Sequence, residues 1–219
     1  MRATEAFDAQ GLAQPLLVER KETTWSLVTE YGLTDRMTLQ VKGDWQQGQD
    51  AGFTYEGRGP VELGLMWQVW RDDQTAIGVY VGAAQGGDAR NAGYALPGQG
   101  GRDYEVRALA GRAVHFETSR FGARSVFAEV QMARRFRESL SDETRMDLTV
   151  GSEIGSDWLL LGQAFGGVAD NSGARWLSLE SSAVRHFGSW SAQLGWRRAV
   201  LGRDSPRHQG LVLALWRRF

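Results

Sequence analysis

The chain has 219 residues, a formal net charge of −1 at pH 7, 28 glycines, 4 prolines and no cysteine. Because charges of both signs are spread along the whole chain, we expect no nucleic-acid partner. The absence of cysteine excludes disulfides, thiolate metal ligands and cysteine nucleophiles. No stretch approaches the length of about 18 apolar residues that a transmembrane helix needs. No linker composition divides the chain, so we predict one domain over residues 1–219.

From Thr24 onward, apolar and polar residues alternate with a period of two, which is typical of strands with unlike faces. The clearest stretches, each with one apolar and one mostly polar face, are "RMTLQVKGDW" (36–45), "VELGLMWQVW" (61–70), "RSVFAEVQMARR" (124–135) and "TRMDLTVGSEI" (144–154). Weaker alternation predicts further strands over residues 23–31, 75–85, 103–116, 157–168, 174–187, 189–200 and 209–219. The chain is therefore predicted to be all-β.

The predicted connections alternate between short and long, as in the up-and-down barrels of bacterial outer membranes. Short turns are expected at "YGLTD" (31–35), "RDDQ" (71–74), "ETSRF" (117–121), "EIGSD" (153–157) and "HFGSW" (186–190). Longer loops are expected at residues 46–59, 85–102, 137–143, 170–174 and 202–208. An even strand count also requires residues 2–9 to be the surviving end of a truncated first strand, with 10–21 as its extracellular loop. We therefore predict a transmembrane antiparallel up-and-down β-barrel of about twelve strands.

Two features favour a membrane barrel over a soluble barrel or sandwich. Most predicted strands are close to the 9–11 residues that cross a bilayer at a tilt. Aromatic residues also occur near the predicted strand ends, where interfacial girdles form, at Trp25, Tyr31, Trp45, Trp67, Trp158, Phe187, Trp190 and Trp196. The expected location is the bacterial outer membrane. Since "MRATEAFDAQG" has no apolar core, we expect a signal peptide to be absent from this chain.

The C-terminal stretch "LVLALWRRF" (211–219) resembles the outer-membrane assembly signal of Gram-negative barrels. The matching positions are Leu211, Leu213, Leu215 and the terminal Phe219. This resemblance implies recognition by the barrel-assembly machinery. Arg217 departs from the pattern, which favours an apolar residue there, and either a bulge or a snorkelling arginine would reconcile it.

A second resemblance lies in "EYGLTDRMTLQV" (30–41), which is similar to a hairpin that recurs in a family of outer-membrane channel proteins named for phenol-degradation pathways. The resemblance is specific over these residues and diffuse elsewhere. It implies a barrel in the outer membrane more strongly than it implies any substrate.

If the apolar faces contact lipid, the polar faces line the lumen. Two interpretations of these charges remain open: rings that set the selectivity of a water-filled path, or ion pairs that plug a narrow barrel. A barrel of about twelve strands is intermediate in size between barrels of about eight strands, whose interior is filled by side chains, and porins of about sixteen strands, which enclose an open channel. The lumen-lining candidates are Arg36, Lys42, Asp44, Glu62, Gln68, Glu105, Arg107, Glu129, Arg135, Arg145, Asp147, Glu153, Glu180 and Arg197.

Other chemistry has little support in the sequence. His115, His186 and His208 are far apart in the chain and show no metal-binding spacing, so we predict no metal site, no cofactor and no catalytic residue. A hydrolase would need a Ser–His pair, for which His186 with Ser182 is the nearest possibility. Arg134, Arg135 and Arg137 form a cluster at a strand end, either a solvated rim or a site for phosphates of lipopolysaccharide.

The sequence thus predicts a small passive channel for polar solutes in the outer membrane. The alternative is a closed barrel that serves as a structural or partner-binding subunit and acts through its extracellular loops. The expected partners are outer-membrane lipid and lipopolysaccharide, the barrel-assembly machinery, small polar solutes and a protein at the loops.

Overall fold

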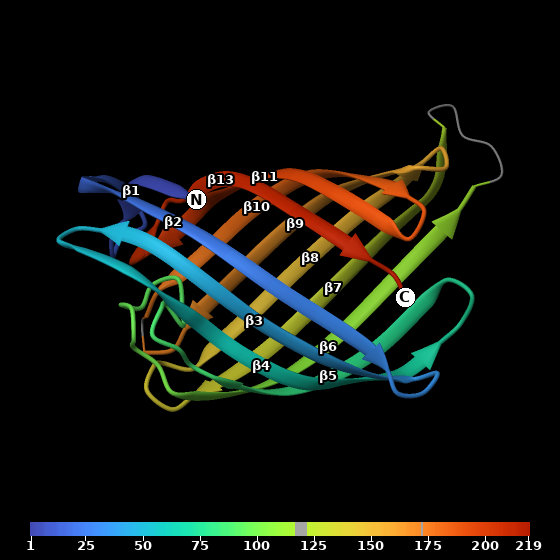
Figure 1. The fold of residues 1–219 in the computed structure, drawn as a ribbon, viewed down its shortest axis with the longest axis horizontal. Helices are drawn as coiled ribbons and strands as arrows, with labels where there is room; N and C mark the ends of the chain where they lie inside the picture. Colours follow the sequence, from blue (N-terminus) through green and yellow to red (C-terminus); the bar gives the residue numbers. More distant parts are fainter. Residues whose placement is uncertain (117–121, 172) are drawn as a thin grey trace.

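The computed structural model describes residues 1–116, 122–171 and 173–219, and all of its strands belong to one antiparallel sheet (Figure 1). The strands are β1 (Arg2–Phe7), β2 (Ala13–Gly32), β3 (Met37–Asp50), β4 (Phe53–Arg71), β5 (Thr75–Gln85), β6 (Arg102–His115), β7 (Ala123–Arg137), β8 (Glu143–Ile154), β9 (Trp158–Ala169), β10 (Arg175–Phe187), β11 (Trp190–Arg203), β12 (Ser205–Pro206) and β13 (Gln209–Arg217). Among these described residues, no helix is long and apolar enough to cross a membrane.

The sheet closes on itself. From β2 to β11 each strand pairs with the next along the chain, β11 pairs with β13, and β1 pairs with both β13 and β2. Twelve strands therefore form the wall, and the two residues of β12 pair with the end of β1. The predicted fold class, an up-and-down antiparallel barrel of about twelve strands, is confirmed.

Side chains alternate between the two faces of the wall, with apolar side chains outside and polar ones inside, which is the reverse of a soluble barrel. Large apolar side chains are exposed on the outside, among them Leu148 on β8 and Leu194 on β11. Charged side chains of the opposite parity are buried inside, such as Glu105 and Glu180. All eight aromatic residues predicted for the girdles are exposed: Trp25, Tyr31, Trp45, Trp67, Trp158, Phe187, Trp190 and Trp196. The polar core lies within the barrel and an apolar surface surrounds it.

At one end of the barrel, which we call the turn end, the strands are joined by tight turns. Gly188, with φ of 62°, occupies the first position of the two-residue turn between β10 and β11, a place that favours glycine. In the turn after β4, the Asp72 carboxylate accepts backbone N–H bonds from Gln74 at 2.8 Å and Thr75 at 2.7 Å. These two donors lower the pKa of Asp72 from its ordinary value. The predicted turn at residues 117–121 lies outside the described residues.

At the opposite end, which we call the loop end, the structure corrects three predicted loops. Residues 10–21 are mostly strand, because β2 begins at Ala13 and only a tight turn separates it from β1. The predicted loop 46–59 is a hairpin whose strands are interrupted only at Ala51–Gly52. Residues 202–208 include the end of β11 and all of β12. Glutamine and glycine in these extensions hide the alternation, because their outward side chains are polar or absent. The predicted loop 170–174 includes Ser172, which lies outside the described residues.

The closing seam of the barrel is short. The first strand predicted at residues 2–9 is present as the six residues of β1, which meet β13 at one residue pair, Arg2 with Gln209. Beyond that pair, residues 23–32 of β2 and 211–217 of β13 have no strand partner on their facing edges among the described residues. Figure 1 shows β13 and β2 diverging toward the turn end.

Candidate functional site

The longest connection at the loop end among the described residues, 86–101 between β5 and β6, packs against side chains that point into the lumen. We call it the plug loop. Ala89, Arg90 and Asn91 are almost completely buried within it. In Figure 1 this segment lies within the loop-end mouth of the barrel instead of extending away from it. It is therefore the segment that narrows the barrel most at this end.

Arg90 attaches the plug loop to the wall formed by β2, β3 and β4. Its guanidinium pairs with Asp50, lies 3.6 Å from Glu22, and donates through Nε to the hydroxyl of Tyr55 at 3.1 Å. The side chain of Gln46 also bonds both the N–H and the carbonyl oxygen of Arg90, each at 3.1 Å. A guanidinium satisfies several fixed acceptors at once, so this contact fixes position as well as charge.

Two further residues attach the plug loop to the far wall. The carbonyl oxygen of Asn91 accepts bonds from the guanidinium of Arg137 on β7 at 3.3 and 3.4 Å. The hydroxyl of Tyr94 donates to Glu143 on β8 at 2.7 Å, and its ring lies 6.0 Å from that of Trp176 on β10. The plug loop is thus bound on both sides of the lumen.

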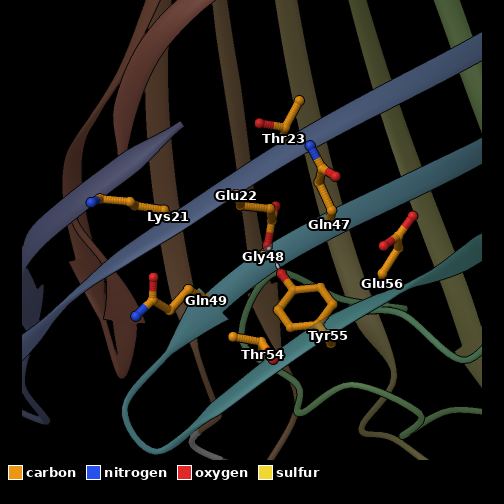
Figure 2. A pocket seen from close by; sticks show the side chains of 9 residues that line it. All are labelled: Lys21, Glu22, Thr23, Gln47, Gly48, Gln49, Thr54, Tyr55 and Glu56. Atoms are coloured by element: carbon orange, nitrogen blue, oxygen red, sulfur yellow. Dashed lines mark hydrogen bonds between the residues drawn. The ribbon is translucent and has the colours of Figure 1, made fainter.

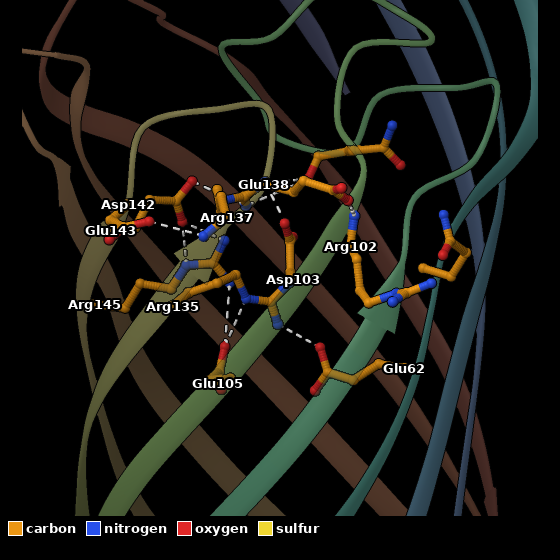
Figure 3. A network of polar contacts seen from close by, with 12 residues as sticks. Glu62, Arg102, Asp103, Glu105, Arg135, Arg137, Glu138, Asp142, Glu143 and Arg145 are labelled. Atoms are coloured by element: carbon orange, nitrogen blue, oxygen red, sulfur yellow. Dashed lines mark hydrogen bonds and ion pairs between the residues drawn. The ribbon is translucent and has the colours of Figure 1, made fainter.

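Below the plug loop, ion pairs cross the lumen (Figure 3). Arg135 on β7 pairs with Glu62 on β4, although β5 and β6 separate these strands in the sheet. The same guanidinium bonds Glu105 at 2.8 Å and lies 3.6 Å from Asp103. Since these strands are not neighbours, the pair with Glu62 spans the interior and does not follow the wall.

A second set of pairs adjoins the first. Glu143, which is fully buried, lies 2.9 Å from Arg137 and 2.5 Å from Arg145. Arg137 also lies 3.2 Å from Asp103, which links the two sets through a shared carboxylate. Buried charges are tolerated only when they are paired in this way. We call the residues Glu62, Asp103, Glu105, Arg135, Arg137, Glu143 and Arg145 the lumen network.

Tyr80 shows how the wall leaves room for this network. Its ring lies flat over Gly64 and Gly82, where an added Cβ would lie 2.1 and 2.5 Å from the tyrosine hydroxyl oxygen. The hydroxyl donates to Glu62 at 2.7 Å, and Arg107 lies 5.3 Å above the ring. Glycine at both positions is therefore required by this close approach.

Nearer the turn end the lumen has separate polar groups. Glu180 on β10 pairs with Arg197 at 2.7 Å and accepts bonds from Ser182 and Gln193. Arg197 also lies 4.3 Å from the ring centroid of Phe165. These groups have fewer ion pairs than the lumen network, which lies nearer the loop end.

The structure places thirteen of the fourteen predicted lumen residues on the inward parity of their strands. The exception is Arg36, which is exposed in the turn between β2 and β3 and lies in no strand. Glu62, Glu105, Arg135 and Arg145 meet in the lumen network. Arg107 adjoins the network, because its Nε donates to Glu105 at 2.9 Å. The other eight lie elsewhere along the lumen: Lys42, Asp44, Gln68, Glu129, Asp147, Glu153, Glu180 and Arg197.

The structure places two groups of side chains that the sequence left open, the arginines of β7 and His186. The arginines of β7 do not form one surface: Arg135 and Arg137 are buried inside, while Arg134 faces outward and bonds Asp170 at 2.9 Å. The sequence offered Ser182 as the nearest serine for a Ser–His pair with His186, but the structure pairs His186 with another serine. The His186 ring nitrogen Nδ1 lies 2.8 Å from Ser191, because strand parity and the β10–β11 register place Ser191 opposite it.

Sequence reasoning missed the plug loop residues. Arg90, Asn91 and Tyr94 lie in a glycine-rich stretch that reads as a flexible extracellular loop. The available signal was the presence of an arginine, an asparagine and a tyrosine among small residues, since such side chains seek buried partners. Glu143 was also missed because it stands at a strand boundary.

Two hollows accompany these elements. One, of about 220 Å³, lies under the plug loop and is lined by residues of β2, β3, β4, β7 and β8. The other, of about 430 Å³, is a shallow hollow over the extensions of β2, β3 and β4 (Figure 2). Tyr55 and Glu22, joined by a 2.5 Å hydrogen bond, lie at its base in Figure 2.

The C-terminal strand presents Leu211, Leu213 and Leu215 on the exposed outer face. Its register with β11 is continuous, so no bulge accounts for Arg217. Instead the Arg217 guanidinium lies between two rings, 5.1 Å from that of Trp190 and 5.3 Å from that of Phe219. Phe219 itself extends past the end of β13 and is fully exposed.

No family model matches the chain, and no curated protein matches it by sequence. Among solved structures, the chain is similar to an outer membrane channel from Pseudomonas putida F1, with a TM-score of 0.69. The identity is 13%, and the match covers 98% of this chain and 89% of the other. At this identity the likeness establishes a shared fold: the chain has the barrel architecture of that outer membrane channel.

Proposed function

We propose that this protein is a channel of the bacterial outer membrane that passes small polar solutes through a constricted lumen. The observation that carries the proposal is the inverted barrel: exposed leucine, valine and tryptophan outside, and buried charges inside. Closed barrels satisfy every backbone group within the wall, which suits them to hydrocarbon surroundings. A charged interior suits water and polar solutes. In this barrel β1 supplies the closing strand, through its pairs with β13 and β2.

The plug loop and the lumen network form the proposed constriction. Attached on both sides, the plug loop limits the size of solutes, while the paired charges below it select for polarity. In this proposal the turn end and the C-terminus face the periplasm, and the loop end faces outward, as in other up-and-down barrels. The similar fold of the Pseudomonas putida F1 channel supports transport as the role.

Contacts with the surrounding membrane follow from the same proposal. The exposed apolar belt contacts lipid, and the aromatic side chains near the strand ends lie at the headgroups. Outside the wall at the loop end, Arg134 lies within reach of lipopolysaccharide phosphates, although its own pairs with Asp170 and Asp142 weaken that attraction. The resemblance of residues 30–41 to outer-membrane channels named for phenol-degradation pathways also supports this proposal.

A second candidate function is a closed barrel that acts through a protein partner at its loops. The ion pairs that cross the lumen favour it, because Arg135 joins acidic groups of β4 and β6 directly beneath the plug loop. A lumen filled in this way conducts only if the plug loop moves or if water passes beside the network.

Liposome swelling separates the two candidates. Purified barrel is reconstituted, its incorporation is verified by flotation, and swelling is recorded in isosmotic sugars of increasing size. A channel gives swelling that falls steeply with sugar size, because the constriction excludes larger solutes. In the same vesicles, Asp147→Asn with Glu153→Gln will reduce the ratio of cation to anion permeability. Absence of swelling despite confirmed incorporation would instead favour the closed barrel.

The terminal phenylalanine gives a prediction about assembly. Phe219→Ala will reduce the amount of heat-modifiable barrel in outer-membrane fractions severalfold, because the proposed assembly signal ends at that side chain. Phe187→Ala is the matched control, since Phe187 is also an exposed aromatic residue at the turn end. The measurement is gel mobility of unboiled against boiled fractions. Equal yields of the two variants would contradict the assembly role of Phe219.

A further inference from the structure

We propose that the cavity under the plug loop binds small zwitterions that carry an ammonium and a carboxylate on one carbon, with Lys42 and Asp44 as the residues that recognise them. This inference rests on the proposed function and names a class of solute for it. The cavity has a volume of about 220 Å³, and its charged lining includes Lys42, Asp44, Glu62, Arg90, Arg135 and Arg145.

Most charges of this cavity are already paired. Arg90 is held by Asp50 and lies near Glu22, and Arg135 is held by Glu62 and Glu105. Arg145 lies 2.5 Å from Glu143 and is likewise engaged. These arginines form the rigid frame of the cavity, and their charges are not free to bind a solute strongly.

Lys42 and Asp44 differ from the rest of the lining. Within residues 1–116, 122–171 and 173–219, neither makes an ion pair within 4.0 Å, and they are not paired with each other. One carboxylate oxygen of Asp44, Oδ1, is buried without a hydrogen-bond partner, while the residue as a whole is half-buried and Lys42 is exposed to the lumen. Both residues lie on the inward face of β3, two positions apart. The cavity therefore presents one positive and one negative group without partners on one strand.

The strand opposite Asp44 is irregular at this point. The register of β3 with β4 shifts between Gly43 and Trp45, so that Gly59 and Pro60 together lie opposite Asp44. Proline cannot donate to the ladder and occurs in sheets at such bulges. A Cβ on Gly59 would lie 3.1 Å from the Cβ of Asp44, so glycine permits the close approach. Bulges commonly direct a side chain toward a functional site.

The kind of cation also distinguishes this site. The chain has 23 arginines and only two lysines, Lys21 and Lys42, and Lys42 is the lysine that faces the lumen. Arginine suits fixed pairs because its planar fork binds carboxylates in two places, whereas lysine is a mobile point charge with three donors. A lysine in a lumen otherwise lined by fixed arginines suits a carboxylate that binds and leaves.

The two free charges select a ligand with complementary charges. A carboxylate would bind the ammonium of Lys42, and an adjacent ammonium would bind the carboxylate of Asp44. A simple anion or cation pairs with only one of the two charges, whereas a zwitterion pairs with both, the half-buried Asp44 and the exposed Lys42. A neutral sugar satisfies neither charge. The volume restricts the ligand to a small amino acid or a similar molecule.

Calorimetric titration of the folded barrel in detergent tests this site with L-serine as the probe, and with acetate and ethylammonium as its separate halves. We expect serine to bind at least tenfold more tightly than either half. Lys42→Gln and Asp44→Asn should each weaken serine binding at least tenfold. The control variants Lys21→Gln and Glu153→Gln remove a lysine from the outer parity of β2 and an acid from the turn end of the lumen, and both should bind serine as the unchanged chain does.

The inference is overturned if serine binds no better than acetate or ethylammonium, or if the Lys42 and Asp44 variants bind it normally. Retained heat-modifiability shows that each variant is folded. Because the titration needs no transport, its outcome is independent of liposome swelling. Swelling without serine binding would retain the channel and reject the site. Binding without swelling would retain the site in a barrel that does not conduct.

Discussion

Arg90→Ala will at least double the single-channel conductance of the barrel in planar lipid bilayers. The Arg90 side chain is only 4% exposed and forms the contact of the plug loop with Asp50, Glu22 and Tyr55. Removing one partner of a buried ion pair costs about 3–5 kcal/mol, since the remaining carboxylates are left without their cation. A loss of that size is sufficient to release a surface loop from its bound position.

The matched control for this variant is Asp88→Asn, which changes an exposed residue of the same loop. It should leave the conductance unchanged. Deletion of residues 89–99 provides the limiting case, because it removes the plug loop from the lumen without depending on one contact. If the deletion variant conducts no better than the unchanged chain, the plug loop is not the constriction, and the lumen network below it becomes the remaining barrier.

The fold could be predicted because the barrel wall obeys a simple rule along most of its length. In β8, Met146, Leu148 and Val150 face outward while Arg145 and Asp147 face inward, and this alternation is visible in the sequence. The rule weakens where strands extend past the apolar belt. In Gln46–Gly59 the outward side chains are mostly polar, so the alternation vanishes although the ladder continues. In Ala13–Glu22 the adjacent apolar residues Leu17 and Val18 are both exposed, which also breaks the period of two.

The lumen residues could be assigned to a face but not to partners. Parity places Glu62 and Arg135 inside, yet nothing in the sequence indicates that they meet across two intervening strands. That contact depends on the curvature and stagger of the closed wall, which are properties of the whole sheet. The inward path of the plug loop depends equally on tertiary contacts, since Arg90 and Asp50 are 40 residues apart in the chain.

The lumen network gives the largest expected effect on stability. Arg135→Leu will lower the free energy of unfolding by about 3–5 kcal/mol, because one buried guanidinium serves Glu62 and Glu105 and lies near Asp103. Without it, those carboxylates face one another in a poorly solvated space. Urea titration of the barrel in lipid vesicles, followed by tryptophan fluorescence, measures the change.

Two further variants show whether the loss comes from the unpaired acids. Arg36→Gln, in an exposed turn, should change the free energy of unfolding by less than about 0.5 kcal/mol. Adding Glu62→Gln to Arg135→Leu should recover part of the lost stability, because Glu62 has no other cation within 4.0 Å among the described residues, whereas Glu105 keeps its pair with Arg107. A loss below about 1 kcal/mol for Arg135→Leu alone would mean that water already screens these charges. The lumen beneath the plug loop would then be open to solvent, and the balance between the two candidate functions would shift toward the channel.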